Sequence, residues 1–412
     1  MQVTKRCDVA RPPVSRTAYA GRVSTATAIP ALAELTTLRV GGPADAYVEA
    51  TSEAELVDTV RAADDAGEPL LVLGGGSNLL VADEGFGGVV VRDVRTGFRL
   101  DSADACGGAS VSAVGGQDWD ELAAAAVEHG WVGVEALSGI PGTVGAAPVQ
   151  NIGAYGQEVA GVLSTVRTWD RLHGRVRTFA VGELGLGYRT SLLKRSMRDL
   201  PSDADPAAPW YPTPRWVVLD VTFQLRLGTD SAPVGYAELA RRLGVEVGDR
   251  APSTAVREAV LELRAGKGML LDGRFGSAPG ADHDRWSAGS FFMNPVVAAD
   301  QADLLPPDAP RYPVRSTVPM TTTGPSLGRI DPSLVKTSAA WLIDRAGFGK
   351  GYGVAGADSR ATLSTRHTLA LTNRGGASAE DVVALARVIR DGVLDTFGIE
   401  LEPEPVLVGV SL

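Results

Sequence analysis

The segment from Leu137 to Gly156 constrains the fold of this chain more than any other stretch of the sequence. It contains five glycines and two prolines, separated by small residues, and it carries no charged side chain. Because glycine lacks a Cβ atom and adopts positive φ angles freely, backbone N–H groups in such a segment can approach a ligand closely. The segment therefore predicts a loop that binds an anionic ligand through its main chain.

A second glycine cluster comes earlier in the chain. A strand predicted over Pro69–Leu73 runs directly into the loop Gly74, Gly75, Gly76, Ser77 and Asn78. Two such loops predict a long, phosphate-bearing cofactor, although glycine is common here (49 of 412 residues) and two ordinary tight turns are the alternative. Leu79 stands where a G-x-G-x-x-G motif needs its third glycine, and Gly349-Lys350 lacks the Ser or Thr of a P-loop. The sequence therefore predicts neither a Rossmann dinucleotide-binding fold nor a P-loop fold for the cofactor.

The order of three motifs resembles that of the UDP-N-acetylenolpyruvoylglucosamine reductases, flavoenzymes that complete UDP-N-acetylmuramic acid for peptidoglycan. The motifs are Leu38-Arg39-Val40-Gly41-Gly42-Pro43-Ala44, the Gly74–Asn78 loop, and Ile140-Pro141-Gly142 with the later stretch Asn151–Gly156. The first two alone indicate only the flavin fold shared with vanillyl-alcohol-oxidase-like proteins. Motifs in the C-terminal half are specific to the reductases, and the resemblance covers about residues 32 to 409.

The resemblance implies an α+β fold with an FAD-binding part of the PCMH or vanillyl-alcohol-oxidase-like type. That part consists of two α+β subdomains, and a C-terminal α+β domain binds the substrate. We predict a loose N-terminal extension over residues 1–30, the FAD-binding domain over 31–228 and the substrate-binding domain over 229–400. Residues 401–412 contain a final strand, Pro405–Val410, which we expect to return to the FAD-binding part.

Capping residues and hydrophobic periodicity predict the individual elements. Ser52 and Glu55 form a capping box that begins a helix, and Gly67 ends it, while a second helix runs from Asp118 to Gly130. Alternating apolar residues predict a strand over Trp216–Leu227. Further helices are predicted over Tyr236–Leu243, Ser253–Ala265, Ser333–Ala346 and Ser378–Phe397, and loops over Ser196–Arg215, Asp272–Asp284 and Leu305–Pro325.

Charge and cysteine content argue against several classes of protein. A formal net charge of −10 and a pI near 5.1 disfavour a nucleic-acid or anionic-membrane partner. Cys7 and Cys106 are the only cysteines, and the four histidines are scattered, so we expect neither a disulfide framework nor a metal site. No apolar run is long enough for a membrane span, and none follows Lys5 and Arg6. We expect a cytoplasmic protein, either a monomer or a weak oligomer.

The resemblance assigns the cofactor. We expect non-covalently bound FAD, because no histidine or cysteine stands beside the cofactor motifs, and NADPH as the co-substrate implied by the family. No separate dinucleotide fold is visible, so the nicotinamide is expected to enter the substrate cleft in turn. The expected FAD contacts are Gly74, Gly75, Gly76, Ser77, Asn78, Ser138, Ile140, Pro141, Gly142, Gly145, Asn151, Gly153, Ala154 and Tyr155.

Three residues match the catalytic positions of the family. Reduction of the enol ether adds a hydride at C3, and the negative charge that develops at C2 and on the carboxylate requires a cation and a nearby acid. Arg189, in Tyr-Arg-x-Ser, fits stabilisation of that charge, and Ser290 matches the proton donor to C2. Glu404 matches the third residue, which polarises the enolate or assists proton transfer. Taken alone, Arg189 would more often be a salt-bridging surface arginine, Ser290 a turn or strand-edge serine, and Glu404 a solvated loop carboxylate.

Residues on the substrate side also follow from the resemblance. Tyr236 and Lys267 resemble the diphosphate-binding tyrosine and lysine, and a lysine is a flexible point charge suited to a diphosphate. The other expected contacts with the nucleotide sugar are Asn294, Lys336 and His367. Tyr312 resembles a tyrosine of a substrate-covering loop, although its spacing to Lys336 is longer than usual. Val406 stands where some members carry an arginine.

Two alternative functions use the same fold. One is a flavin-dependent oxidase that acts on a sugar or alcohol. Covalent flavin attachment in such an oxidase would need a histidine or cysteine beside the cofactor motifs, and this sequence has none there. A non-catalytic protein that binds a nucleotide sugar would have no use for a proton donor. The joint presence of Arg189, Ser290 and Glu404 therefore favours the reductase.

Overall fold

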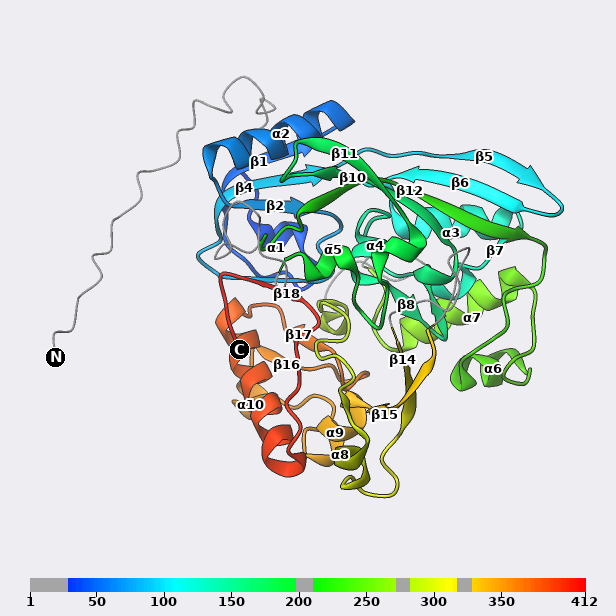
Figure 1. Cartoon of the computed structure of the whole chain (residues 1–412). Helices are drawn as coiled ribbons and strands as arrows, with labels where there is room; N and C mark the ends of the chain where they lie inside the picture. Colours follow the sequence, from blue (N-terminus) through cyan, green and yellow to red (C-terminus); the bar gives the residue numbers. More distant parts are fainter. Residues whose placement is uncertain (1–28, 198–209, 272–281, 317–327) are drawn as a thin grey trace.

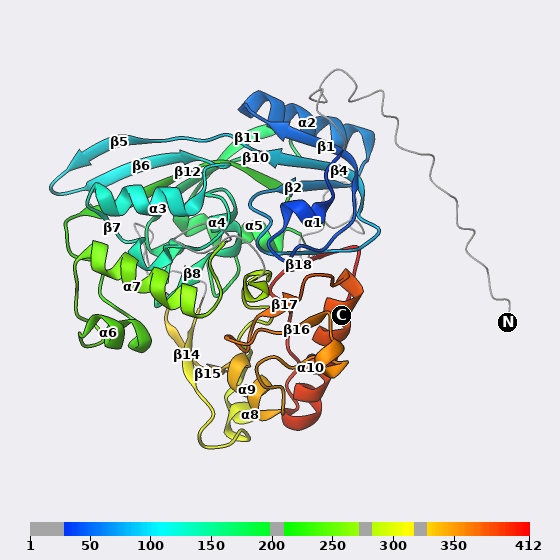
Figure 2. The same cartoon turned by 180° about the vertical axis from the view of Figure 1, so that it is seen from behind.

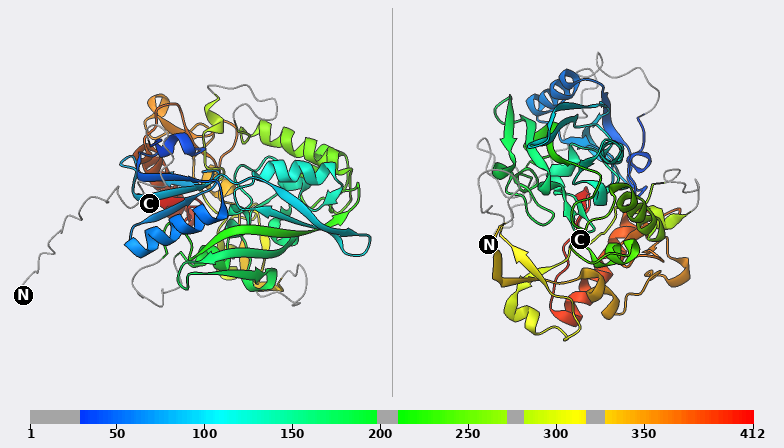
Figure 3. Two further views of the ribbon diagram at one scale, coloured as in Figure 1. Left: turned by 90° about the horizontal axis from the view of Figure 1, so that it is seen from above. Right: turned by 90° about the vertical axis from the view of Figure 1, so that its right-hand side faces the viewer.

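The computed structural model describes residues 29–197, 210–271, 282–316 and 328–412, and it has a β-rich upper part above a smaller lower domain (Figure 1). Strands β1, β2, β4 to β6 and β10 to β12 lie in the upper part, and α8, α9, α10, β16 and β17 lie below them in the view from behind as well (Figure 2). The right-hand view of Figure 3 shows the same division. The N-terminal extension predicted over residues 1–30 lies almost entirely outside the described residues.

The first subdomain is a small parallel sheet with one helix packed on it. Its strand order is β1-β4-β2, so the connection from β1 through α2 to β2 crosses over the strand between them. Apolar residues on one face of α2, including Leu56 and Val60, pack against Val89 and Val91 of β4. The elements are α1 (Leu32–Leu35), β1 (Ala44–Ala50), α2 (Glu53–Ala66), β2 (Leu70–Leu73), β3 (Leu79–Val81) and β4 (Phe86–Asp93).

The predicted ends of α2 are confirmed, with one difference in the cap. The Ser52 hydroxyl accepts a hydrogen bond from the Glu55 N–H at 3.2 Å, and Gly67 ends the helix with a left-handed φ of +63°. The Glu55 carboxylate, however, accepts from the Thr51 N–H at 2.8 Å instead of the Ser52 N–H. The capping box is therefore only half formed, because the carboxylate reaches one residue further back.

The second subdomain is an antiparallel sheet in the order β11-β10-β12-β6-β5, covered on one face by α3. Trp119 of α3 packs against Phe223 of β12, with ring centroids 6.0 Å apart. The strand predicted over Trp216–Leu227 is confirmed as β12, and α3 (Trp119–Glu128) confirms the predicted second helix. The other elements are β5 (Phe98–Asp104), β6 (Gly108–Val114), β7 (Trp131–Val132), α4 (Ala146–Gln150), β8 (Gly153–Ala154), β9 (Gln157–Glu158), β10 (Leu163–Asp170), β11 (Arg175–Ala180) and α5 (Leu192–Arg195).

Helices α6 (Ala237–Leu243) and α7 (Ser253–Gly266) follow β12; α7 lies beside α3, and α6 packs against α7 (Figures 1 and 2). Their apolar residues form a buried cluster with Ala136, and the partly buried Tyr155 packs against this cluster. Both residues belong to the second subdomain. Both helices have the predicted extent to within one residue. The domain boundary near residue 229 stays a prediction.

The lower domain is built around α10, whose apolar face is completely buried. Its elements are β13 (Val296–Ala298), α8 (Ala299–Asp303), β14 (Tyr312–Arg315), β15 (Ile330–Lys336), α9 (Ala339–Arg345), β16 (Ala361–Leu363), β17 (Leu371–Asn373) and α10 (Ala379–Phe397). The predicted start of α10 is confirmed, because Ser378 and Asp381 form a complete capping box. Across the described ranges, no helix combines the length and apolarity that crossing a bilayer demands.

Two predictions in this region are wrong. The helix predicted over Ser333–Ala346 begins only at Ala339, because residues 330–336 form β15 between β13 and β14. The Ser338 hydroxyl provides the cap by accepting from the Trp341 N–H at 3.3 Å. The predicted loop Leu305–Pro325 contains β14, which pairs with β15. Residues 198–209, 272–281 and 317–325, which belong to predicted loops, lie outside the described residues, as do residues 326 and 327.

The predicted return of the chain to the FAD-binding part is confirmed. Strand β18 (Val406–Val408) pairs in parallel with β3, which directly follows the first glycine loop. The first motif also joins the two parts, since Leu38 and Val40 are buried in the same core cluster as α10. The Asn373 amide donates to the backbone oxygens of Leu38 and Arg39.

The N-terminus of α10 is capped by a residue from the first subdomain. The Asp83 carboxylate accepts hydrogen bonds from the N–H groups of Ala379, at 2.8 Å, and Glu380, at 3.4 Å. A carboxylate at this position satisfies otherwise unpaired N–H groups and complements the helix dipole. The cap therefore connects the two parts of the molecule.

We expect Asp83→Ala to lower the free energy of unfolding by about 1 kcal/mol, as for other lost helix caps. Asp83→Asn should lose less, because the amide oxygen still accepts from the helix N–H groups. Urea denaturation of the two variants, each compared with the unaltered protein, measures the difference. Equal losses for both substitutions would contradict capping as the main role of Asp83.

Candidate active site

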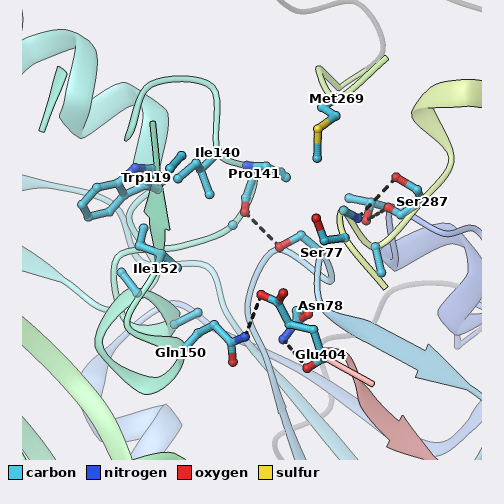
Figure 4. Close-up of a pocket in the computed structure, with 18 of the residues that line it drawn as sticks. Ser77, Asn78, Trp119, Ile140, Pro141, Gln150, Ile152, Met269, Ser287 and Glu404 are labelled. Atoms are coloured by element: carbon cyan, nitrogen blue, oxygen red, sulfur yellow. Dashed lines mark hydrogen bonds between the residues drawn. The ribbon is translucent and has the colours of Figure 1, made fainter. Parts of the chain in front are cut away.

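A pocket lies where the two glycine loops, α4 and the segments around Ser290 and Glu404 meet (Figure 4). Figure 4 shows Trp119, Ile140 and Ile152 on one side of it and Ser287 and Met269 on the other. Segments that are far apart in the sequence thus surround one space. Its empty volume is about 1030 Å³, a figure that includes the part open to solvent.

The two glycine loops pack directly on each other at the pocket. The Ser77 hydroxyl donates to the Pro141 carbonyl at 2.9 Å (Figure 4). A Cβ atom on Gly75 would lie 2.6 Å from Cα of Gly142, and one on Gly76 would lie 1.9 Å from the Leu35 carbonyl oxygen. Real Cβ atoms do not come this close to backbone, so the first loop needs glycine for close packing.

The predicted cofactor-binding residues divide into two groups. Those that line the pocket are Ser77, Asn78, Ile140, Pro141, Gly142, Gly153 and Ala154. Those that support the lining without forming part of it are Gly74, Gly75, Gly76, Ser138, Gly145, Asn151 and Tyr155. Asn151, for example, is fully buried and donates to the Gly187 carbonyl at 2.8 Å, which fixes the turn before Arg189.

Arg189 reaches the pocket from a tight turn. Gly187 and Thr190 exchange two backbone hydrogen bonds, and Arg189 between them has a left-handed φ of +53°. This conformation costs a non-glycine residue roughly 1–2 kcal/mol. The guanidinium donates from Nη2 to the Gly153 carbonyl at 2.8 Å, and its Nε lies 2.9 Å from Oε1 of Glu404.

Glu404 is held by three segments of the chain. Its N–H donates to the Phe291 carbonyl at 2.8 Å, and its own carbonyl accepts from the Asn78 amide at 3.4 Å. Its Oε1 accepts from Nε2 of Gln150 at 3.0 Å and is paired with Arg189 (Figure 4). The carboxylate, the first glycine loop and the Ser290 segment are therefore fixed relative to one another.

Ser290 lines the same pocket. The following Phe291 and Phe292 are both about 1% exposed and anchor the segment in the core of the lower domain. In the described parts of the chain, no protein group accepts from or donates to its hydroxyl. The hydroxyl is thus available to a ligand, and all three predicted catalytic residues line one pocket.

The expected diphosphate-binding residues form a cluster outside this lining. The rings of Tyr155 and Tyr236 meet edge to face with centroids 5.7 Å apart, and Nζ of Lys267 lies 5.3 Å from the Tyr155 ring centroid. Lys267 is paired with the Glu238 carboxylate at 2.6 Å. Burial, assisted by the nearby Lys267, lowers the pKa of His367 to about 4. At neutral pH this imidazole is therefore uncharged.

The remaining substrate-side residues gather around Tyr188. The Tyr188 hydroxyl accepts from the Asn294 N–H at 3.3 Å, and Nζ of Lys336 lies 4.4 Å from the Tyr188 ring centroid. Burial lowers the pKa of Lys336.

Tyr312 is the partner of Lys336 across the β14–β15 pair. Val406 is a half-buried residue of β18 that packs in an apolar cluster of the first subdomain.

Sequence reasoning missed a buried cation in the pocket lining. Arg264 is only 6% exposed, and its Nη2 donates to the Met269 carbonyl at 3.0 Å, but its Nε has no partner in the described structure. A buried guanidinium with an unused donor suits an anionic group such as a flavin or a phosphate. Together with the two loops, Arg264 fits FAD. Its only sequence signal was its place three residues before Lys267.

The chain is an α+β protein whose two glycine loops and buried arginine surround a pocket that fits a flavin cofactor. A family model described as an FAD binding domain matches residues 44–177. A second model, the C-terminal domain of UDP-N-acetylenolpyruvoylglucosamine reductase, matches residues 281–408. The protein is an FAD-dependent oxidoreductase.

Similar proteins identify the family. The chain is 52% identical over 381 residues to the UDP-N-acetylenolpyruvoylglucosamine reductase of Cutibacterium acnes, covering 92% of this chain and 90% of that protein. It is 54% identical to the protein of that name from Nocardia farcinica, covering 92% and 89%. The crystal structure of the reductase from Thermus caldophilus matches with a TM-score of 0.55 at 26% identity, covering 92% and 98%. The chain belongs to the UDP-N-acetylenolpyruvoylglucosamine reductase family.

Proposed function

We propose that this enzyme reduces UDP-N-acetylenolpyruvoylglucosamine to UDP-N-acetylmuramate, a step of peptidoglycan precursor synthesis, with NADPH as the electron source. The observation that carries the proposal is the convergence of Arg189, Ser290 and Glu404 on one pocket that also fits FAD. FAD, held by the two glycine loops and Arg264, would supply the hydride for C3 of the enolpyruvyl group, and NADPH would be the source of that hydride. The nicotinamide and the substrate use the same cleft in turn.

Ser290 protonates C2 in this mechanism. Hydride addition at C3 leaves an enolate, with its charge shared between C2 and the carboxylate, and an enolate is basic enough to take a proton from a hydroxyl. The proton passes from Oγ of Ser290 to C2, which becomes the new stereocentre. The absence of a protein partner for this hydroxyl in the described residues is consistent with a group that serves the ligand.

Arg189 and Glu404 act on the charge of the intermediate. The guanidinium, already held by the Gly153 carbonyl, offers its cationic face to the substrate carboxylate or enolate oxygen. Glu404 balances this cation and keeps it oriented through the 2.9 Å ion pair. The left-handed backbone at Arg189 aims its side chain into the pocket, where the cost of that conformation is recovered by these contacts.

The purified protein is expected to be yellow, and acid precipitation should release FAD into the supernatant. Anaerobic NADPH should bleach the flavin absorbance, and UDP-N-acetylenolpyruvoylglucosamine should restore it. The unsubstituted UDP-N-acetylglucosamine, which has no enol ether, serves as the control and should restore nothing. A bleached flavin that the enolpyruvyl substrate fails to reoxidise would refute the proposed reaction, while a protein that takes up no FAD would refute the cofactor.

We expect Lys267→Ala to raise KM about tenfold or more while changing kcat much less. A lysine that binds the diphosphate contacts the ground state and the transition state alike, so its loss affects binding rather than the chemical step. In the free enzyme Glu238 occupies this lysine at 2.6 Å, and a diphosphate must replace that carboxylate. Steady-state kinetics over substrate concentration give both constants. An unchanged KM with a lowered kcat would remove Lys267 from the binding role.

A further inference from the structure

Only one of the two oxygens of the Glu404 carboxylate accepts a hydrogen bond from the described part of the chain. Oε1 accepts from Nε2 of Gln150 at 3.0 Å and lies 2.9 Å from Nε of Arg189. Within the described ranges, no side chain or backbone group donates a hydrogen bond to Oε2. Because Glu404 lines the pocket and is mostly buried, this asymmetry leaves Oε2 as the oxygen that can face a ligand.

A lysine behind the pocket fixes the direction of the Gln150 amide. Nζ of Lys194 donates to Oε1 of Gln150 at 2.8 Å. An ammonium group can only donate hydrogen bonds, so it holds the amide oxygen towards itself and the NH₂ group towards Glu404. The order Lys194, Gln150, Glu404 thus runs from a cation through an oriented amide to a carboxylate, and each link polarises the next.

The local structure holds this row of side chains in place. Gln150 is the last residue of α4, and Lys194 lies in α5. The fully buried Ser191 hydroxyl donates to the Val149 carbonyl at 2.7 Å and accepts from the Lys194 N–H at 3.0 Å. The end of α4 and the start of α5 are therefore connected at one atom, which fixes the two side chains relative to each other.

We propose that Lys194 and Gln150 are positioning residues for Glu404 and set which of its oxygens faces the substrate. The inference rests on the proposed function, because it assigns a purpose to the free oxygen of a catalytic carboxylate. Lys194 acts only through Gln150 and does not contact the substrate. Its contribution should therefore disappear when Gln150 can no longer transmit it.

The test is a double-mutant cycle followed by stopped-flow absorbance of the flavin. We expect Lys194→Met and Gln150→Leu each to slow substrate-driven reoxidation about tenfold, the effect of one lost charge-assisted hydrogen bond. Flavin reduction by NADPH should stay within about twofold of the wild type, and kcat should fall more than KM rises. Lys194→Arg, which also only donates, should recover most of the rate. Arg99→Met, at an exposed arginine of β5, is the control for charge removal.

The double variant decides between positioning and direct contact. If Lys194 acts through Gln150, adding Lys194→Met to Gln150→Leu causes no further loss. Additive losses, or a rise in KM that persists without Gln150, would show that Lys194 contacts the substrate itself and would overturn the inference. If Gln150→Leu fails to bind FAD, the comparison of Lys194→Met with Lys194→Arg still tests it. A wild-type enzyme that the substrate cannot reoxidise would instead refute the proposed function.

Discussion

Ser290→Ala is expected to separate the two half-reactions of the enzyme. Flavin reduction by NADPH involves no protonation of the enolpyruvyl group, so its rate should be almost unchanged. Reoxidation by the substrate needs the proton at C2, and loss of a positioned general acid costs about 10²- to 10⁴-fold in rate. That loss corresponds to roughly 3–5 kcal/mol of transition-state stabilisation.

The side chain can be exchanged here with little disturbance of the fold. No group in the described residues forms a hydrogen bond with the Ser290 hydroxyl, and the buried Phe291 and Phe292 hold the backbone. Ser290→Cys should recover part of the rate, because a thiol is a stronger acid of similar size. Stopped-flow absorbance of the flavin follows each half-reaction separately. Equal slowing of both half-reactions by Ser290→Ala would assign the serine a structural role.

Gly75→Ala is expected to weaken FAD binding about 10- to 100-fold, the effect of a few kcal/mol of overpacking. The new Cβ would lie 2.6 Å from Cα of Gly142 and 3.1 Å from its N atom. Because these atoms belong to the backbone, the two glycine loops must separate. Gly75 does not have a positive φ, so the effect is purely steric. Separation of the loops would also break the bond from Ser77 to Pro141.

Gly161→Ala is the matched control, because its Cβ would meet nothing within 4 Å and its backbone is not left-handed. Titration of the apoprotein with FAD, followed by flavin fluorescence, measures the dissociation constant for each variant. Unchanged FAD affinity in Gly75→Ala, with the thermal midpoint equal to that of the control, would mean that the loops need not touch.

Local signals in the sequence predicted the elements that depend on nearby residues. Ser378 with Asp381, Gly67 and the alternation along Trp216–Leu227 each define a structure within a few positions. The helix predicted from Ser333 failed because β15 is stabilised by pairing with β13 and β14, which a local pattern does not reveal. Strand pairing between distant segments is decided by tertiary contacts.

The site was predictable only where a motif carried it. The resemblance identified Arg189, Ser290 and Glu404, and all three line one pocket, although their roles stay predictions. Gln150 and Arg264 had no signal of their own in the sequence, because the direction of an amide and a guanidinium Nε without a partner in the described residues depend on packing. The glycines of the first loop were expected to face the cofactor. That expectation stays a prediction, and Gly75 and Gly76 also provide room for neighbouring backbone.

The pairing of β18 with β3 has a consequence for the order in which the protein is made. Asn78 and Glu404, which the pairing brings together, are 326 positions apart in the chain. While the ribosome is still adding the lower domain, β3 has no partner strand and the pocket lacks its carboxylate. The nascent FAD-binding region therefore exposes an open strand edge throughout most of translation, a state in which it is vulnerable to mispairing. Activity can begin only after synthesis has passed β18.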